Sequence, residues 1–201
     1  MRVRALLLTG CLALGACNAT SDTSVREREA ERAQQIEALT GWDRVFGAPE
    51  EALKWSRQYG FATRDYQPTG ARPAYRAAGK AITLSSTAAE MPNKATFVAT
   101  GRTADALEQI VFTLKLTDPD NAATAEKRFA DLIRQYLAKF DIEDDGALLD
   151  AITQETSTGG TIEGAPVTVE RSDATEAMPA AITVTFTRPA ATSADNSKPQ
   201  G

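Results

Sequence analysis

The chain has 201 residues, a net charge of −5 and no histidine. Its length suits one domain with a hydrophobic core and short tails, and its acidic balance argues against nucleic acid as a partner. The absence of histidine removes the commonest general base near neutral pH and the commonest metal ligand, so we expect no cofactor.

The N-terminal residues have the layout of an export signal. Two arginines, Arg2 and Arg4, precede an apolar run at 5–16, and Cys17 follows this run directly. The run has the length of a signal-peptide core and is too short to cross a bilayer, which takes about 20 apolar residues. Its last part, LGAC at 14–17, resembles the lipobox of bacterial lipoproteins.

The resemblance implies a definite processing of this segment. Residues 1–16 would be the cleaved signal peptide, and Cys17 would become the first mature residue and carry the lipid. In that family an aspartate after the cysteine tends to retain the protein in the inner membrane. Asn18 stands there in this chain, which implies an outer-membrane protein facing the periplasm. The membrane would be a partner through the lipid on Cys17, because two or more acyl chains anchor a protein stably.

A second lipobox-like sequence, LTGC, ends at Cys11. Lipidation there would leave only residues 5–10 as the apolar core, below the usual minimum of about seven residues, so length favours Cys17. Two other interpretations stay open: an ordinary cleaved signal with a bystander cysteine, and a cytosolic protein with an apolar N-terminal helix. Because Cys11 and Cys17 are the only cysteines, we expect no internal disulfide in the mature chain.

The composition after the signal divides the chain into four segments. Residues 17–24 are small and polar and predict a lipid-anchored flexible tether. Residues 25–40 are rich in charge and helix formers, which predicts a charged helix or stalk. Residues 41–188 carry the apolar pattern of a single α+β domain. Residues 189–201 lack bulky apolar side chains and predict a disordered tail.

Apolar periodicity predicts the elements of the domain in chain order. A helix that begins at Pro49 is followed by a loop at 66–80, three strands, a long helix at 118–140 and a short helix. A turn at 156–160 precedes two more strands. The strands cover 81–86, 95–100, 107–117, 161–170 and 181–188, and the short helix covers 145–154. This order predicts an α+β fold in which an antiparallel sheet of about five strands packs on one long helix.

The two tryptophans, Trp42 and Trp55, are the only ones in the chain. They lie in a segment with helical apolar spacing, which favours a place in the core. The alternative is an aromatic platform for a ligand.

A cationic segment interrupts this acidic chain between residues 54 and 80. It contains a single acid, Asp65, and three interleaved tyrosines at 59, 66 and 75; its cations are Lys54, Arg57, Arg64, Arg72, Arg76 and Lys80. Arginine forks beside aromatic faces suit anionic or glycan groups. In the cell envelope such groups are peptidoglycan carboxylates, lipid phosphates or an acidic protein. The alternative is a solvated surface whose charges balance the acids at 27–51.

An acidic connection, DIEDDG at 141–146, resembles the first half of an EF-hand calcium loop. Loop position twelve should be a bidentate glutamate but is Ile152, and position nine is Leu149. The alternative is that Asp144 or Asp145 caps the following helix. The missing ligands favour capping, so we expect no metal site.

The sequence contains no motif of a nucleophilic, metal-dependent or phosphate-binding enzyme. We therefore expect a lipid-anchored, non-enzymatic binding or assembly protein of the cell envelope. An envelope protein, an anionic glycan or an anionic lipid would be its partner. Two alternatives stay open: an inhibitor or immunity-type protein that blocks a periplasmic enzyme, and a glycan hydrolase that uses two carboxylates across a cleft.

Overall fold

The computed structural model describes residues 19–85, 89–154 and 156–190. The signal peptide and Cys17 lie outside the described residues, as does most of the C-terminal segment. The chain divides into two compact units, residues 1–38 and residues 39–201. We describe each unit by itself.

The first unit contains helix α1, Ala19–Glu37. The helix begins six residues earlier than its predicted start at 25, so residues 19–24 are helical where a tether was expected. From residue 25 to Glu37 every side chain except that of Ile36 is exposed. The Nε of Arg28 donates a hydrogen bond to the carbonyl oxygen of Ser24 at 2.9 Å. This helix therefore carries charge on all sides and has little apolar surface to bury.

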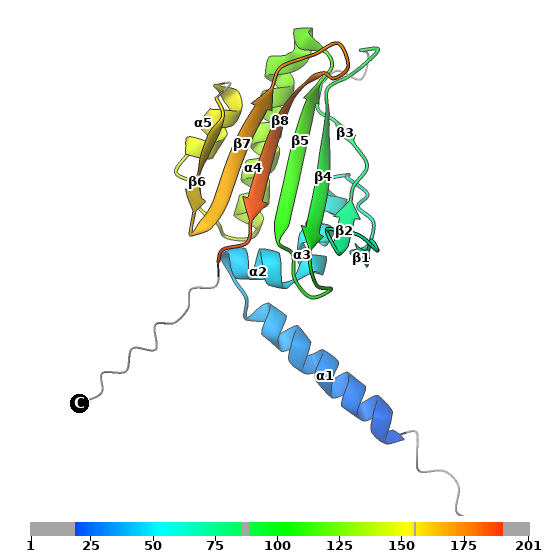
Figure 1. Ribbon diagram of the computed structural model, residues 1–201. Helices are drawn as coiled ribbons and strands as arrows, with labels where there is room; N and C mark the ends of the chain where they lie inside the picture. The colour runs from blue at the N-terminus through cyan, green and yellow to red at the C-terminus, as the bar shows by residue number, and fades with distance from the viewer. Residues whose placement is uncertain (1–18, 86–88, 155, 191–201) are drawn as a thin grey trace, which may run out of the picture. The chain divides into compact units, whose positions relative to one another are not determined.

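The described part of the second unit forms an eight-stranded antiparallel sheet (Figure 1). The strand order is β1-β2-β4-β5-β8-β7-β6, and β3 pairs with β4. The strands are β1 Gln67–Pro68, β2 Tyr75–Ala78, β3 Ile82–Thr83, β4 Lys94–Gly101, β5 Gln109–Leu116, β6 Thr158–Ile162, β7 Ala165–Ser172 and β8 Ala180–Thr187.

The antiparallel α+β class is confirmed, but the prediction of about five strands is wrong. Strands β1 and β2 form inside the predicted loop at 66–80, and β6 covers most of the predicted turn at 156–160. All three lie toward the edges of the sheet, where one side of the strand has no neighbour or a short one. Such strands carry a weak apolar alternation and form because a neighbouring strand offers hydrogen bonds.

Several helices of the second unit cover one face of the sheet, rather than one long helix (Figure 1). A helix about 10 Å wide covers roughly two strands spaced about 4.8 Å apart, so a sheet of this width needs more than one. The elements are α2 Gly41–Gly47, α3 Pro49–Gln58, the short 3₁₀ turn η1 Pro119–Asn121, α4 Ala122–Lys139 and α5 Ala147–Thr153.

The core lies between this helical layer and the sheet, and Phe112 of β5 is near its centre. Phe112 contacts the rings of Trp55, Tyr136 and Phe186 at centroid distances of 6.0, 5.2 and 6.3 Å. Trp42 and Trp55 are 4% and 1% exposed, so both belong to the core. Complete burial raises the pKa of the Tyr136 hydroxyl well above its ordinary value.

Candidate functional site: a basic hollow at the sheet edge

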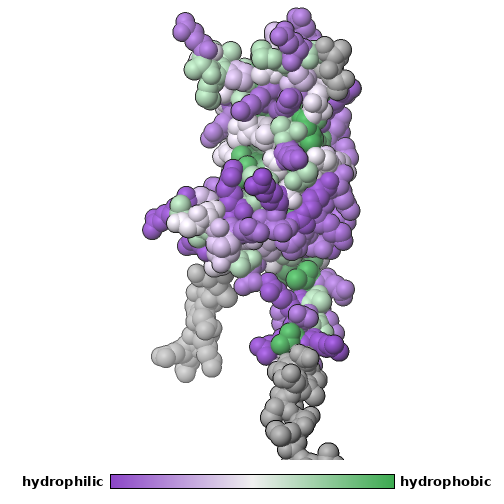
Figure 2. All heavy atoms as spheres, turned by 90° about the vertical axis from the view of Figure 1, so that its right-hand side faces the viewer, coloured by the Kyte–Doolittle hydropathy of each residue, from purple (hydrophilic) through white to green (hydrophobic). Residues whose placement is uncertain are grey.

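Three of the six predicted cations line one hollow of about 420 Å³ at the β1–β2 edge of the sheet. They are Arg64, Arg76 and Lys80, and Asp65 is the single carboxylate in the lining. We call this site the basic hollow. Figure 2 looks onto this side of the molecule and shows hydrophilic side chains gathered across its middle. The site is open and its three cations are exposed, so a charged ligand could enter without a conformational change.

Strand geometry brings these cations together. Successive side chains of a strand point to opposite faces, so burial of Ala77 toward the helices places Arg76 on the other face. The segment before β1 runs alongside β2, and the backbone N–H of Arg64 donates to the carbonyl oxygen of Ala78 at 3.3 Å. Lys80 follows two residues later. Three residues from two separate stretches of chain thus meet on one edge.

The wall of the hollow is tightly built. A Cβ added to Gly79 would lie 2.7 Å from the Cβ of Phe61 and 2.9 Å from its carbonyl oxygen, so only glycine fits there. Ala62, next in the lining, has a φ of 45°, a conformation that costs a non-glycine residue energy. The chain therefore holds this turn in place through close packing, and the hollow is preformed.

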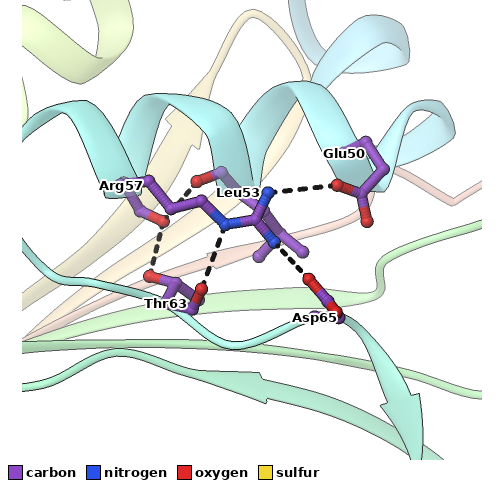
Figure 3. Close-up of polar contacts among 6 residues, drawn as sticks. Glu50, Leu53, Arg57, Thr63 and Asp65 are labelled. Carbon is purple, nitrogen blue, oxygen red and sulfur yellow. Dashed lines mark hydrogen bonds and ion pairs between the residues drawn. The ribbon is translucent and has the colours of Figure 1, made fainter.

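Arg57 does not join the basic hollow. Its guanidinium pairs with Glu50 at 3.3 Å and Asp65 at 2.9 Å, and its Nε donates to the Thr63 carbonyl oxygen at 3.0 Å (Figure 3). Below it, the Ser56 hydroxyl contacts that of Thr63 at 2.6 Å. We call this group the Arg57 clamp, because it fastens α3 to residues 63–65.

The remaining predicted members of the patch also lie elsewhere. Lys54 and Arg72 are exposed and do not line the hollow. The tyrosines are occupied by packing: Tyr59 stacks on Trp55 at 4.3 Å, and the Tyr66 hydroxyl donates to the Ala106 carbonyl oxygen at 3.0 Å. Burial, followed by the charge of Glu108, raises the pKa of Tyr66 to about 12. The hollow therefore offers charge and hydrogen bonds but no aromatic stacking surface.

The acidic connection at 141–146 leads into α5, whose N-cap is Gly146 and not an acidic residue. Asp145 Oδ1 accepts a hydrogen bond from the backbone N–H of Ala147 at 3.0 Å, at the first turn of α5. Burial raises the pKa of Asp144 above its ordinary value. The described residues contain no group of three or more acidic or cysteine side chains placed to hold a metal ion.

A larger hollow, of about 1020 Å³, lies at the end of the sheet next to α2. It was not predictable from the sequence, because its residues come from five stretches of chain between 42 and 190. Its charges balance: Arg102 and Arg188 face Asp43 and Glu108, and Arg102 pairs with Glu108. A charge-balanced hollow has no preference for an anion or a cation, so the basic hollow is the stronger candidate.

The carboxylate pair Glu50 and Glu51 is occupied by ion pairs. Glu50 pairs with Arg57, and Glu51 pairs with Arg44 at 3.1 Å. A glycosidase needs two carboxylates facing each other across a cleft, one of them kept protonated. Two adjacent acids that each bind an arginine do not provide that arrangement.

No family model, curated protein or solved structure matches this chain. None of the helices that the described residues form combines the length and the apolar character needed to cross a bilayer.

Proposed function

We propose that this protein is a lipid-anchored, non-enzymatic binding or assembly protein of the cell envelope. Its basic hollow would bind an anionic group of its partner. The observation that carries the proposal is the convergence of Arg64, Arg76 and Lys80 in one preformed site on a chain of net charge −5. The N-terminal resemblance to lipoproteins supports the anchor at Cys17 and the location at the outer membrane, facing the periplasm.

The chemistry of the hollow favours a small, multiply charged anion. Two guanidinium forks can each form two parallel hydrogen bonds with a carboxylate or a phosphate, and the ammonium of Lys80 adds a third charge. Asp65 is partly neutralised by Arg57, so it opposes the anion only weakly. Peptidoglycan carboxylates and lipid phosphates both have this chemistry, as do acidic side chains of a protein.

The hollow is tested by co-sedimentation of the detergent-purified full chain with peptidoglycan sacculi and, separately, with phosphatidylglycerol vesicles. We expect retention by one of them, and at least a tenfold loss of affinity in the Arg64→Ala/Arg76→Ala variant. The control variant Lys54→Ala/Arg72→Ala removes the same charge outside the hollow and should bind normally. Equal losses in both variants would mean that only net charge matters, and would overturn the assignment of the site.

The anchor is tested separately by membrane fractionation. Cys17→Ala should move the protein from the membrane fraction to the soluble fraction and abolish incorporation of labelled palmitate, whereas Cys11→Ala should change neither. A Cys17→Ala protein that stayed membrane-bound would contradict the lipoprotein interpretation.

A second candidate function is an inhibitor or immunity-type protein. The observation that favours it is a run of exposed acids, Asp141, Glu143 and Asp145, on the connection between α4 and α5. Such a run could occupy a cationic enzyme site. Affinity capture with the wild-type chain and with an Asp141→Asn/Glu143→Gln variant distinguishes the two candidates. A stoichiometric enzyme partner lost only from this variant would favour inhibition.

A further inference from the structure

The sheet has a second face, opposite the helical layer, and none of the helices α2 to α5 lies over it (Figure 1). We call it the open face. Alternation along the four central strands assigns its residues, and the strand register aligns them in rows. Its central positions are Thr96, Val98, Thr100, Gln109, Val111, Thr113, Thr168, Thr183, Thr185 and Thr187.

The composition of the open face is unusual for a solvated surface. A sheet face exposed to water ordinarily carries charged side chains along its length. Here the two middle rows hold threonine and valine on all four strands, except for Glu170 at the β7 end of one row. One row runs Thr96, Thr113, Thr183 and Glu170, and the Thr113 and Thr183 hydroxyls lie 3.4 Å apart. Depletion of charged residues toward the centre of a surface, with charges near its border, is a feature of protein–protein interfaces.

The charges at the border of this face are divided between its two halves. Lys94 of β4 and Lys115 of β5 lie directly opposite each other at one end. Glu170 lies on β7, on the other side of the face, paired with Thr183. Two like charges directly opposite each other destabilise a sheet. The described residues contain no ion pair that involves any of these three side chains. One half of the face is thus cationic and the other anionic.

We infer that the open face packs against the open face of a second copy of this chain. The two-fold axis runs parallel to the strands, between β5 and β8. This operation places β4 over β7 of the second copy, with Thr96 over Glu170. Lys94 and Lys115 lie one row away, about 7 Å along the strands, where their long side chains approach that Glu170. The same contacts form twice by symmetry. Thr113 then lies over the partner's Thr183, and the threonine and valine methyl groups meet at the centre. Face-to-face sheets pack in this way about 10 Å apart.

Other arrangements satisfy the charges less well. A two-fold axis perpendicular to the strands would place the lysine end over the end that carries Thr100 and Gln109, with the cation Arg76 beside it. An extended polyanion could contact the lysines but would cross Glu170. The charge pattern therefore favours a second copy in the orientation described.

The size of the face fits a reversible dimer. Four strands about 4.8 Å apart and eight residues long span about 19 Å by about 27 Å, before the relief of the side chains is counted. This is about 510 Å². Standard interfaces bury roughly 600–1,000 Å² per partner and transient ones less, so the face is of the size of a weak, reversible contact. The parallel axis also leaves α2 of both copies at the same end of the dimer, because Trp42 lines a hollow with Thr100 and Thr187. Two chains anchored in one membrane need both copies of α2 at the same end of the dimer. This argument from the anchor is the one part of the inference that rests on the proposed function.

The dimer is tested by light scattering of the full chain in detergent, with the detergent mass measured separately. We expect the mass of two chains at micromolar concentration. A Lys94→Glu/Lys115→Glu variant and a Glu170→Lys variant should each weaken association at least tenfold, because each places like charges across the interface. A mixture of the two variants should restore the two-chain mass, since their charges are then complementary.

The control is Lys127→Glu/Lys139→Glu, which makes the same charge change on exposed positions of α4 and should leave the dimer unchanged. A one-chain mass at every concentration would overturn the inference, as would a mixture of the two variants that stays monomeric while each variant is folded by circular dichroism. The measurement uses neither a ligand of the basic hollow nor a membrane. Its failure would therefore leave the proposed function untouched, and failure of the proposed function would leave the dimer untouched.

Discussion

The two faces of this sheet are built from the same strands but differ in the size and burial of their side chains. On the helix-covered face, Ile110, Phe112 and Leu114 alternate with the open-face positions Val111 and Thr113 along β5. The covered positions are fully buried, and the open ones are only half-buried. Burial of large apolar side chains stabilises the fold. Small β-branched side chains favour the strand conformation because their rotamers are restricted, but they bury little apolar area. The helix-covered face therefore supplies most of the stability of the fold, whereas the open face is available for contact with a partner.

The largest effect is expected from Phe112→Ala on the covered face. Removing a ring that contacts Trp55, Tyr136 and Phe186 loses the transfer free energy and leaves a cavity, at a cost of about 3–5 kcal/mol. The neighbouring change Thr113→Ala, on the open face, should cost less than about 1 kcal/mol. Urea unfolding of both variants measures the difference. Equal costs would show that the two faces do not differ in the way proposed.

A somewhat smaller effect is expected at a buried ion pair on the covered face. Arg171 of β7 donates to Glu126 of α4 at 2.6 Å and to the carbonyl oxygen of Ile152 at 3.1 Å. Arg171→Met should cost about 3 kcal/mol because it leaves the Glu126 carboxylate buried beside an apolar group. The double variant Glu126→Leu/Arg171→Met should cost less than the sum of the two single changes. A double-mutant cycle on unfolding free energies measures this; strict additivity would contradict the coupling.

An intermediate effect is expected where the edge of the sheet is most closely packed. A Cβ at Gly101 would collide with the Tyr66 hydroxyl and the Ala106 carbonyl oxygen. Gly101→Ala should therefore cost about 1–3 kcal/mol and disturb the hydrogen bond between those two groups. Gly160→Ala in β6 is the matched control, because nothing lies within 4 Å of its Cβ position. Thermal unfolding should show a lower midpoint for the first variant and little change for the second.

The smallest effect is expected from Asp144→Asn. Because burial raises the pKa of Asp144 in the folded protein, the folded chain binds more protons than the unfolded chain between the ordinary and the raised pKa. The charged carboxylate thus opposes folding above the raised pKa, and this opposition disappears as the pH falls through it. Asp144→Asn should slightly raise the thermal midpoint at neutral pH, and the gain should shrink toward acidic pH. A gain that grew with acidity would have the wrong sign.

Much of the fold was predictable from periodicity. The strand predicted at 107–117 is β5, and the helix predicted at 118–140 is η1 followed by α4, because long and regular apolar patterns match only one kind of element. The edge strands were not predictable, since β6 with Gly159 and Gly160 has no apolar alternation of its own. Its pairing with β7 supplies the hydrogen bonds that make it a strand.

The candidate site was predictable as a group of charges but not as a geometry. In the extended segment at 63–65, Thr63 and Asp65 bond to residues of α3, whereas the Arg64 side chain joins only the lining of the hollow, which Asp65 also borders. Alternation therefore directs Arg64 away from the Arg57 clamp, and Asp65 lies between the clamp and the basic hollow. A one-residue shift of this segment would exchange their roles, and no count of charges along the chain reveals the register.

By itself, the amino-acid sequence determined the acidic balance of the chain, the lipobox resemblance at Cys17, the α+β class and the cationic segment at 54–80. These properties follow from composition, from short motifs and from the spacing of apolar residues within a single helix or strand. Only the tertiary structure decided which cations meet in the basic hollow, how many strands join the sheet and which face stays open. Those outcomes depend on pairing between distant segments, where the partner strand, and not the local residues, supplies the hydrogen bonds and sets the register.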